Sequence, residues 1–463
     1  MSLRLSERRN LLITVDLILV NLSTLLALYL GAQRSRWGFD LLLILRNLHW
    51  FVFFTVTFAI LAAVNDAHDL RVAVDPVAST ITLVKLNLQQ IAAYALIYFF
   101  AEPGSLPRHI VGFFGLISPP ALLLWRLIYG TTARLPAFQR NVIIAGAGWA
   151  GRVIAEAISE HVPVGLHVVG FVDDDPEKIG KTVVGLPVLG HVNQMVSVAQ
   201  QENVSEIVVA ITHQFPGHLL QRIVKCYENG LQITPMPSLY ERLTGRVLVE
   251  HVGNRWDIVL PISPTSGAET YQAAKRFVDI CISVLGLLLF CPLLPFVALA
   301  IYVDNPGPVF LLQDRVGRRG RVFQVIKFRS MVPDAEEDGV PRWAQKNDRR
   351  VTRVGRFLRR TRIDELPQLL NVLRGDMSFV GPRPERPEFV SQLEQEIPFY
   401  RVRLVVRPGL TGWAQVRYRY GRSVQDALVK LQYDLYYIKH QSFYLDLQIA
   451  LRTIGVVLRM EGT

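Results

Sequence analysis

Residues 357–384 read FLRRTRIDELPQLLNVLRGDMSFVGPRP, and this stretch decides how the C-terminal part of the chain is interpreted. Asp364 is a residue type that begins helices well, and the apolar spacing after it predicts a helix over about residues 365–373. Pro367 is tolerated in the first turn of such a helix. The positive end of the helix dipole favours an ionised carboxylate at Asp364 and also attracts phosphate oxygens.

Arginines precede this acidic pair. Arg359, Arg360 and Arg362 can supply guanidinium forks for a diphosphate. An ionised Asp364 beside Glu365 is suited to covalent phosphoryl transfer, in which one carboxylate attacks phosphorus and the other holds a divalent cation. On spacing alone a plainer interpretation stays open. Asp364 then only caps a helix, Glu365 is an exposed acid, and the arginines form a solvated or lipid-facing surface.

The basic residues of the chain are concentrated around this stretch. The formal net charge is +11, and residues 315–362 contain 15 Lys or Arg against 5 Asp or Glu, which gives +10 in that block alone. Such a block indicates a polyanionic partner or a membrane surface. Because half of all residues are hydrophobic, we expect lipid and nucleotide phosphates as partners, and no nucleic acid. The three cysteines show no paired spacing, so no disulfide framework is expected.

Four apolar stretches occupy the first part of the chain, at residues 11–30, 41–64, 77–100 and 110–130. Each is near the roughly 20 residues that a spanning helix needs, although Lys85, Gln89 and Gln90 interrupt the third. No small-residue cleavage site follows the first stretch, so it does not read as a cleaved signal peptide. Basic residues flank the first and the fourth stretch, so both ends are expected in the cytoplasm.

A fifth apolar run covers residues 277–303. Its interior contains Cys291-Pro292 and then Pro295, which break or kink a helix. A full crossing would also separate the last part of the chain from the preceding domain and from cytosolic substrates. A re-entrant helix that enters and leaves by the same face avoids both problems. The apolar and aromatic stretch at residues 433–458 is expected to lie on the membrane surface.

Residues 141–261 alternate short β-branched runs with amphipathic stretches, which predicts βαβ units around a parallel sheet. Gly146, Gly148 and Gly151 form a complete G-x-G-x-x-G between a predicted strand and a helix, and Asp173 follows at the end of the next strand. This pattern favours a nucleotide site. It equally fits glycines that only permit tight strand–helix packing. A linker rich in Pro, Ser, Thr and Gly closes the domain at residues 261–267.

The chain from about residue 274 to 459 resembles the bacterial sugar transferase family, the monotopic polyprenyl-phosphate phosphoglycosyl transferases. The matching blocks run in order: AAKRFVDICISVLGLLLFCPLLP, DRVGRRGRVFQVIKFRSM, FLRRTRIDELPQLLNVLRGDMSFVGPRP, RPGLTGWAQV and LQYDLYYIKHQSFYLDLQI. The resemblance implies a membrane protein of the α/β class. Residues 1–135 would form four transmembrane helices, 136–262 a Rossmann-like domain, and 263–463 a monotopic catalytic domain with a re-entrant helix at about 274–303.

The resemblance also implies a role for each matching position. Asp364 would be the nucleophile that forms an aspartyl-phosphosugar intermediate, and Glu365 its partner, implicated in binding Mg²⁺. The other positions would contact phosphate, lie near the uridine, or support the site: Lys327, Arg329, Arg359, Pro382, Arg383, Pro384 and Asp434. Cys291-Pro292 would form the membrane turn, where Ser-Pro is common in the family.

The implied reaction moves a hexose-1-phosphate from a UDP-sugar to undecaprenyl phosphate and releases UMP, as the first step of exopolysaccharide repeat-unit assembly. Glucose is the expected hexose and galactose the second choice. The implied cofactor is Mg²⁺, and the partners are the two substrates, membrane lipids and a second copy in a homodimer. The implied location is the bacterial inner membrane, with both soluble domains in the cytoplasm.

Two other functions fit parts of the sequence. A membrane-anchored NAD-dependent nucleotide-sugar epimerase or dehydratase would use a Tyr-x-x-x-Lys pair, which Tyr271 and Lys275 match. We interpret that match as chance, because it lies beyond the linker and beside the fifth apolar run. A non-catalytic, nucleotide-sensing scaffold for polysaccharide assembly would not need the intact Asp364-Glu365 pair and Arg383. The 10 histidines are scattered, so a His/Cys metal site is not expected.

Overall fold

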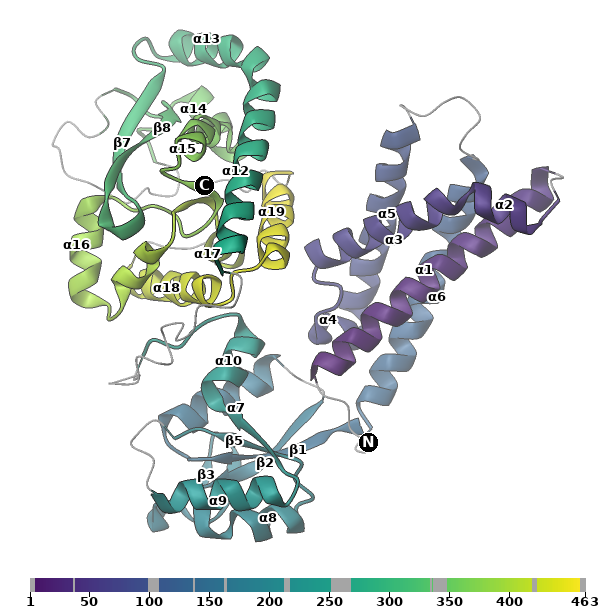
Figure 1. Ribbon diagram of the computed structural model, residues 1–463, viewed down its shortest axis with the longest axis vertical. Helices are drawn as coiled ribbons and strands as arrows, with labels where there is room; N and C mark the ends of the chain where they lie inside the picture. The colour runs from purple at the N-terminus through teal and green to yellow at the C-terminus, as the bar shows by residue number, and fades with distance from the viewer. Residues whose placement is uncertain are drawn as a thin grey trace. The chain divides into compact units, whose positions relative to one another are not determined.

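A computed structural model of the 463-residue chain describes residues 5–35, 38–98, 108–135, 138–161, 165–211, 217–250, 268–333, 335, 348–418 and 423–458. It divides into two compact units, Met1–Leu239 and Tyr240–Thr463. The first unit contains an N-terminal helix bundle and a sheet domain (Figure 1), and the sequence of the second includes Asp364 and Glu365.

The N-terminal part is helical, as predicted. Its helices are α1 (Leu5–Ser35), α2 (Leu41–Arg46), α3 (Leu48–Val64), α4 (Leu70–Val74), α5 (Pro76–Tyr98) and α6 (Arg108–Ala133). In this described part, the segments Glu7–Arg34 and Ile110–Ala133 are long and apolar enough to cross a membrane, and the apolar segment Leu48–Val64 is shorter. Four spans therefore stay a prediction.

Several polar residues of α5 face the interior of the bundle, whereas Lys85 is exposed. Gln90 is buried and donates to the carbonyl of Phe54 at 3.0 Å, and Asn65 donates to Gln89 at 2.9 Å. Around them Phe54 stacks on Phe114, with ring centroids 4.2 Å apart. Side chains of this kind join helices when they are paired with one another inside a bundle. Gln89 and Gln90, two of the residues that interrupt this apolar stretch, thus make helix–helix contacts.

A charged group also lies inside the bundle. Asp16 of α1 is fully buried and accepts from Arg126 of α6, and His68 lies 3.0 Å from the same carboxylate oxygen. Arg126 also donates to the carbonyl of Ala67 at 3.1 Å. Charged side chains within an apolar bundle are costly unless they are paired, so this group fixes how α1, α6 and the turn after α3 meet.

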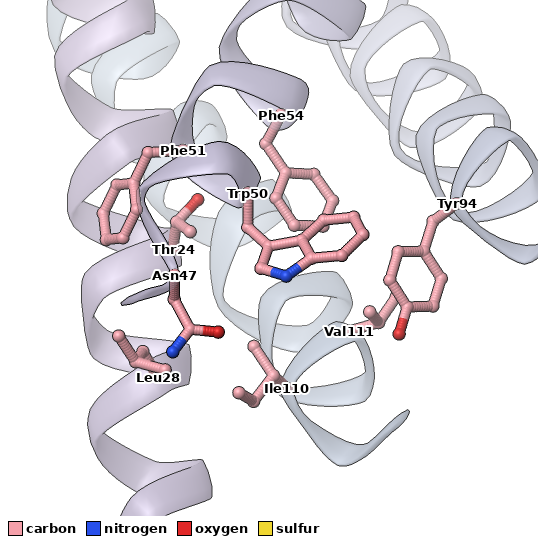
Figure 2. Close-up of a pocket in the computed structure, with 9 residues that line it drawn as sticks. All are labelled: Thr24, Leu28, Asn47, Trp50, Phe51, Phe54, Tyr94, Ile110 and Val111. Carbon is pink, nitrogen blue, oxygen red and sulfur yellow. The ribbon is translucent and has the colours of Figure 1, made fainter. Parts of the chain in front are cut away.

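A hollow lies between helices of the bundle (Figure 2). Aromatic side chains dominate its lining, with Trp50 at the centre and Phe54 and Tyr94 beside it. Among the described residues that line it, none is an acid, a lysine or an arginine.

The predicted parallel sheet is confirmed. Its strands are β1 (Arg140–Ala145), β2 (Leu166–Val172), β3 (Thr182–Val183), β4 (Leu186–Gly190), β5 (Glu206–Val209) and β6 (Gln232–Pro235), in the order β3-β4-β2-β1-β5-β6. All pairs are parallel except the short β3–β4 hairpin. The helices are α7 (Trp149–His161), α8 (Met195–Gln201), α9 (Gly217–Glu228) and α10 (Met236–Thr244). Every residue of β5 is buried, as expected for a central strand covered on both faces.

The second unit begins with the fifth apolar run. Helices α12 (Ala268–Phe290) and α13 (Leu294–Asp304) are separated by a 3₁₀ turn, η4 (Cys291–Leu293), so the predicted interruption at Cys291-Pro292 is confirmed. Figure 1 shows α13 turned away from the direction of α12. The segment Glu269–Asp304 is long and apolar enough to cross a membrane, and most of it faces outward. Its return to one face of the bilayer stays a prediction.

The remaining elements form two small sheets with helices around them. An antiparallel hairpin joins β7 (Phe310–Val316) to β8 (Val322–Phe328), and β9 (Ser378–Val380) pairs in parallel with β10 (Gly409–Thr411). The helices are α14 (Arg353–Thr361), α15 (Leu369–Arg374), α16 (Pro387–Glu396), α17 (Trp413–Arg417), α18 (Val424–Lys439) and α19 (Phe443–Leu458). The 3₁₀ turns are η5 (Arg318–Gly320), η6 (Ile363–Gln368) and η7 (Tyr400–Val405).

The prediction that residues 433–458 lie on the membrane is wrong for their first half. Tyr433, Leu435 and Tyr437 of α18 are buried in the core of the second unit, where Val247 and Val249 pack in the same cluster. The reason is a contact distant in sequence, which the local pattern could not show. Within residues 433–458, the large apolar side chains described as exposed lie on α19, among them Phe443, Leu447 and Ile454.

The glycine motif generates a paired prediction on stability. A Cβ at Gly151 would lie 1.9 Å from the carbonyl oxygen of Gly146, whereas a Cβ at Gly148 would meet nothing within 4 Å. Gly151→Ala should therefore destabilise the sheet domain by about 3 kcal/mol, and Gly148→Ala by less than about 1 kcal/mol. Thermal unfolding of both variants in the same detergent tests this. Equal melting temperatures would show that α7 does not approach β1 so closely.

Candidate functional site

The acidic pair lies in a tight turn between two helices, and Asp364 is not a helix N-cap. Helix α14 ends at Thr361, and Arg362 adopts a left-handed conformation with φ 59°. The turn η6 follows, with Asp364 and Glu365 in its first turn, and α15 starts only at Leu369. The predicted helix over residues 365–373 is therefore present as a 3₁₀ helix that continues into α15, and it starts at Ile363, before Asp364. The sharp reversal at Arg362 buries both carboxylates, each 8% exposed.

Glu365 is held by two arginines. Arg383 donates to its Oε1, and Arg362 lies 3.5 Å from its Oε2. Burial alone would raise the pKa of Glu365, but Arg383 and Arg362 lower it well below its usual range. Glu365 thus stays ionised at neutral pH although it is buried.

Asp364 is different, because its Oδ1 is buried and has no hydrogen-bond partner in the described part of the chain. Burial and the neighbouring charge of Glu365 raise the pKa of Asp364 to about 6, against the opposite effect of Lys327 and Arg359. The sequence had led us to expect that a helix dipole favours the ionised form. In the structure, desolvation and the like charge of Glu365 outweigh the favourable charges around Asp364, so its pKa is raised.

Two predicted phosphate-binding cations face this pair. Lys327 lies on β8, and burial together with Arg315 and Arg383 lowers its pKa to about 7. Arg359 lies in the last turn of α14 and donates from Nε to Ser330 Oγ at 2.8 Å. Both groups act electrostatically on Asp364, so the structure brings them together with it.

Arg329 does not share this arrangement. It is buried, and its guanidinium donates to the main-chain carbonyls of Asn305 and Pro306, directly after α13. These contacts hold the turn that leaves the apolar segment. They give Arg329 a structural role, and its predicted contact with phosphate finds no support in them.

The segment Pro382-Arg383-Pro384 follows β9 and brings Arg383 to Glu365. Asp434, predicted as a substrate-binding acid, is only 1% exposed, and its Oδ2 accepts from Arg403 at 2.9 Å. Burial raises the pKa of Asp434 to about 6, although Arg403 opposes this. Asp434 is therefore buried against Arg403, and its described contact is with that arginine.

Sequence reasoning missed two arginines of this region. Arg315 on β7 donates to the carbonyl of Pro384 at 3.1 Å, and Arg403 in η7 donates to the carbonyl of Arg383 at 2.8 Å. Arg315 lies at the start of the quoted block DRVGRRGRVFQVIKFRSM, where Arg318 and Arg319 follow closely and nothing in the local sequence distinguishes Arg315 from them. Arg403 had no local signal at all.

The residues present fit a divalent cation only in part. No group of three or more His, Cys, Asp or Glu side chains that could hold a metal occurs in the described ranges. However, Mg²⁺ usually takes one or two carboxylates and completes its shell with water and substrate phosphates. The unpartnered Oδ1 of Asp364 and the adjacent Glu365 match that requirement.

The glycine motif of the first unit is assembled as predicted. Gly146 has φ +106°, which favours glycine, and the main-chain N–H of Ala147 donates to Asp173 Oδ2 at 2.6 Å. Burial would raise the pKa of Asp173, but the N–H groups of Asp175 and Ala147 and the amine of Lys178 lower it. Packing explains why residues 146 and 151 are glycines. It does not explain Gly148, which borders open space.

The Tyr-x-x-x-Lys match belongs to the second unit. Tyr271 and Lys275 both lie 2.8 Å from Asp446 Oδ2, and Tyr437 donates to the other oxygen at 2.9 Å. Asp446 thus fastens the start of α12 to α19. This contact accounts for both side chains without a dehydrogenase-type role.

Two family profiles match the chain. The profile described as bacterial sugar transferase matches residues 270–460, and the one described as CoA-binding domain matches residues 69–237. The first covers all the described elements from α12 to α19 except Ala268 and Glu269 at the start of α12.

Curated relatives agree with the first profile. The UDP-N-acetylgalactosamine-undecaprenyl-phosphate N-acetylgalactosaminephosphotransferase of Aeromonas hydrophila is 44% identical over 241 residues, which cover 52% of this chain and 55% of the relative. The UDP-glucose:undecaprenyl-phosphate glucose-1-phosphate transferase of Xanthomonas campestris pv. campestris is 32% identical, over 69% of this chain and 66% of its own length.

The protein of the same name from Escherichia coli (strain K12) is 35% identical, over 68% of this chain and 67% of its own length. The matched part of the chain thus spans between 55% and 67% of the length of these three relatives. Because the E. coli relative is matched over two thirds of its length and the catalytic region fits the family profile, the chain belongs to the bacterial sugar transferase family.

Proposed function

We propose that this protein transfers a sugar-1-phosphate from a UDP-sugar to undecaprenyl phosphate and releases UMP. The observation that carries the proposal is the buried pair Asp364-Glu365, in which Glu365 is paired with arginines and Asp364 keeps an unpartnered oxygen. Lys327 and Arg359 supply positive charge beside it. The names of the relatives support the same reaction class.

In the first half-reaction, a carboxylate oxygen of Asp364 attacks the β-phosphorus of the UDP-sugar. The bond from that phosphorus to the bridging oxygen breaks, and UMP leaves with the electron pair. The product is a mixed anhydride between Asp364 and the sugar phosphate. Lys327, Arg359 and Arg383 neutralise charge on the diphosphate. Because Glu365 pairs with Arg383 and Arg362, these arginines do not form an ion pair with Asp364, which stays available for attack.

In the second half-reaction, an oxygen of the lipid phosphate attacks the same phosphorus. The bond between phosphorus and the Asp364 oxygen breaks, which restores the carboxylate and yields a lipid diphosphate sugar. Splitting the transfer allows a soluble donor and a lipid acceptor to use one site in turn. Mg²⁺, held by Asp364 or Glu365 together with the diphosphate, would supply further charge neutralisation when bound.

The donor sugar and the setting complete the proposal. Glucose is the expected hexose, and two of the relatives described above carry that sugar in their names, whereas the Aeromonas relative carries N-acetylgalactosamine. We place the protein in the bacterial inner membrane, with the catalytic and sheet domains in the cytoplasm, as a homodimer that starts exopolysaccharide assembly. A nucleotide at Gly148 and Asp173 is a further part of this proposal, supported by the open space at Gly148.

Removing the nucleophile should abolish the first half-reaction. Asp364→Asn is expected to lower UMP release by at least about 1,000-fold, because no covalent intermediate can form. Asp314→Asn, which changes an exposed acid on β7, should leave the rate within about twofold. The measurement is UMP release from a panel of UDP-sugars with Mg²⁺, together with mass spectrometry of peptides from the chain. A phosphosugar adduct on another residue would overturn the assignment of Asp364.

The two shifted groups predict a bell-shaped pH dependence of kcat/KM, which reports the free enzyme. Asp364 must be ionised, so activity should be lost as the pH falls through about 6. Lys327 must be charged, so activity should also be lost as the pH rises through about 7. Lys327→Arg should remove the alkaline limb, because a guanidinium does not titrate there. In Glu365→Gln the acid limb should move to lower pH, because the charge of Glu365 raises the pKa of Asp364. A flat profile between pH 5 and 9 would contradict both assignments.

A further inference from the structure

Four consecutive main-chain carbonyls, of residues 382–385, each accept a hydrogen bond. The donors are Gly409 N to Pro382 O at 2.8 Å, Arg403 Nη2 to Arg383 O at 2.8 Å, Arg315 Nη1 to Pro384 O at 3.1 Å and Val316 N to Glu385 O at 2.9 Å. Prolines lack an N–H, so Pro382 and Pro384 cannot donate to a neighbouring strand. The position of the segment therefore depends on donors to its carbonyls, and two of the four are arginine side chains.

Arg403 is the more deeply connected of these two arginines. It is 7% exposed and donates from Nη1 to Tyr400 Oη at 2.7 Å and from Nη2 to Asp434 Oδ2 at 2.9 Å. Both of its terminal nitrogens are thus engaged by groups of the protein. A guanidinium in this state is not available to bind a diphosphate. Arg403 therefore differs in role from Arg359 and Arg383, which are proposed to bind one.

The residue that Arg403 holds by its carbonyl is the same residue that pairs with Glu365 by its side chain. We propose that Arg403, fixed in turn by Asp434, is a positioning residue that sets Arg383 against Glu365. This inference rests on the proposed function, because it concerns how Arg383 is held in position at the site of that reaction. It gives Asp434 an indirect role, in place of the substrate contact expected from the sequence.

The planar fork of arginine is needed at residue 403. One Nη2 reaches both the carboxylate of Asp434 and the carbonyl of Arg383, while Nη1 reaches Tyr400. A lysine keeps the positive charge but cannot hold these three acceptors in one plane. A displacement of about 1 Å in a catalytic group can cost about 100-fold in rate.

A double-mutant cycle on the first half-reaction tests the proposal. Its members are the full-length wild type, Arg403→Lys, Arg383→Ala and the double variant, and the readout is single-turnover UMP release with Mg²⁺ and the UDP-sugar that the wild type uses. We expect Arg403→Lys to slow the reaction by about 100-fold in the wild-type background. In the Arg383→Ala background the same change should cost less than about threefold, because Arg403 acts through Arg383.

Effects that multiply in the double variant would overturn the proposal, since they would mean that Arg403 acts independently of Arg383. An Arg403→Lys rate equal to the wild type would overturn it as well. If Arg403→Lys does not fold, Asp434→Asn takes its place in the cycle with the same expectation, because it removes the charge that holds Arg403. Arg401→Lys is the matched control, an exposed arginine in the same turn that pairs with Glu394. Failure of the wild type to release UMP from any UDP-sugar would instead refute the proposed function.

Discussion

Two neighbouring carboxylates, Asp364 and Glu365, are buried together, and the rest of the catalytic unit depends on how this like-charge pair is tolerated. Burial disfavours charge on either group, and charge on one raises the pKa of the other. Arg383 and Arg362 stabilise the ionised form of Glu365 and so lower its pKa. Asp364 then remains with a raised pKa and a buried oxygen that no described group satisfies. The pair is therefore asymmetric, with one fixed charge and one reactive group.

The cations around Asp364 come from separate elements, and α14, which carries Arg359, must pack closely against the segment after β8. A Cβ at Gly355 in α14 would lie 2.0 Å from the carbonyl oxygen of Ser330, so only glycine allows α14 to pack against the end of β8. That contact brings Arg359 within 2.8 Å of the Ser330 hydroxyl. The position of one arginine in the site thus follows from a glycine one turn earlier.

The sequence was sufficient for features that depend on local pattern. The parallel sheet, the glycine turn at Gly146 and the interruption at Cys291 all follow from short-range steric rules, and the structure has them where they were predicted. The errors concern burial by distant segments. Residues 433–439 were predicted to lie on the membrane, and the burial of Asp364 was not foreseen, because the sequence does not show what covers them. Charge alone also could not separate Arg359, which faces the acidic pair, from Arg329, which holds a turn.

The apolar segment and the phosphate site are linked by short polar contacts. Asp304, the last residue of α13, accepts from the N–H of Val354 at 2.9 Å, and Arg329 donates to the carbonyls of Asn305 and Pro306. The end of α13 is thus fastened to the start of α14 and to the end of β8, the elements that carry Arg359 and Lys327. If α12 and α13 enter the bilayer as proposed, their depth sets the height of both cations above the lipid. Such a link would suit the proposed reaction, in which a soluble diphosphate and a lipid phosphate react in turn at Asp364.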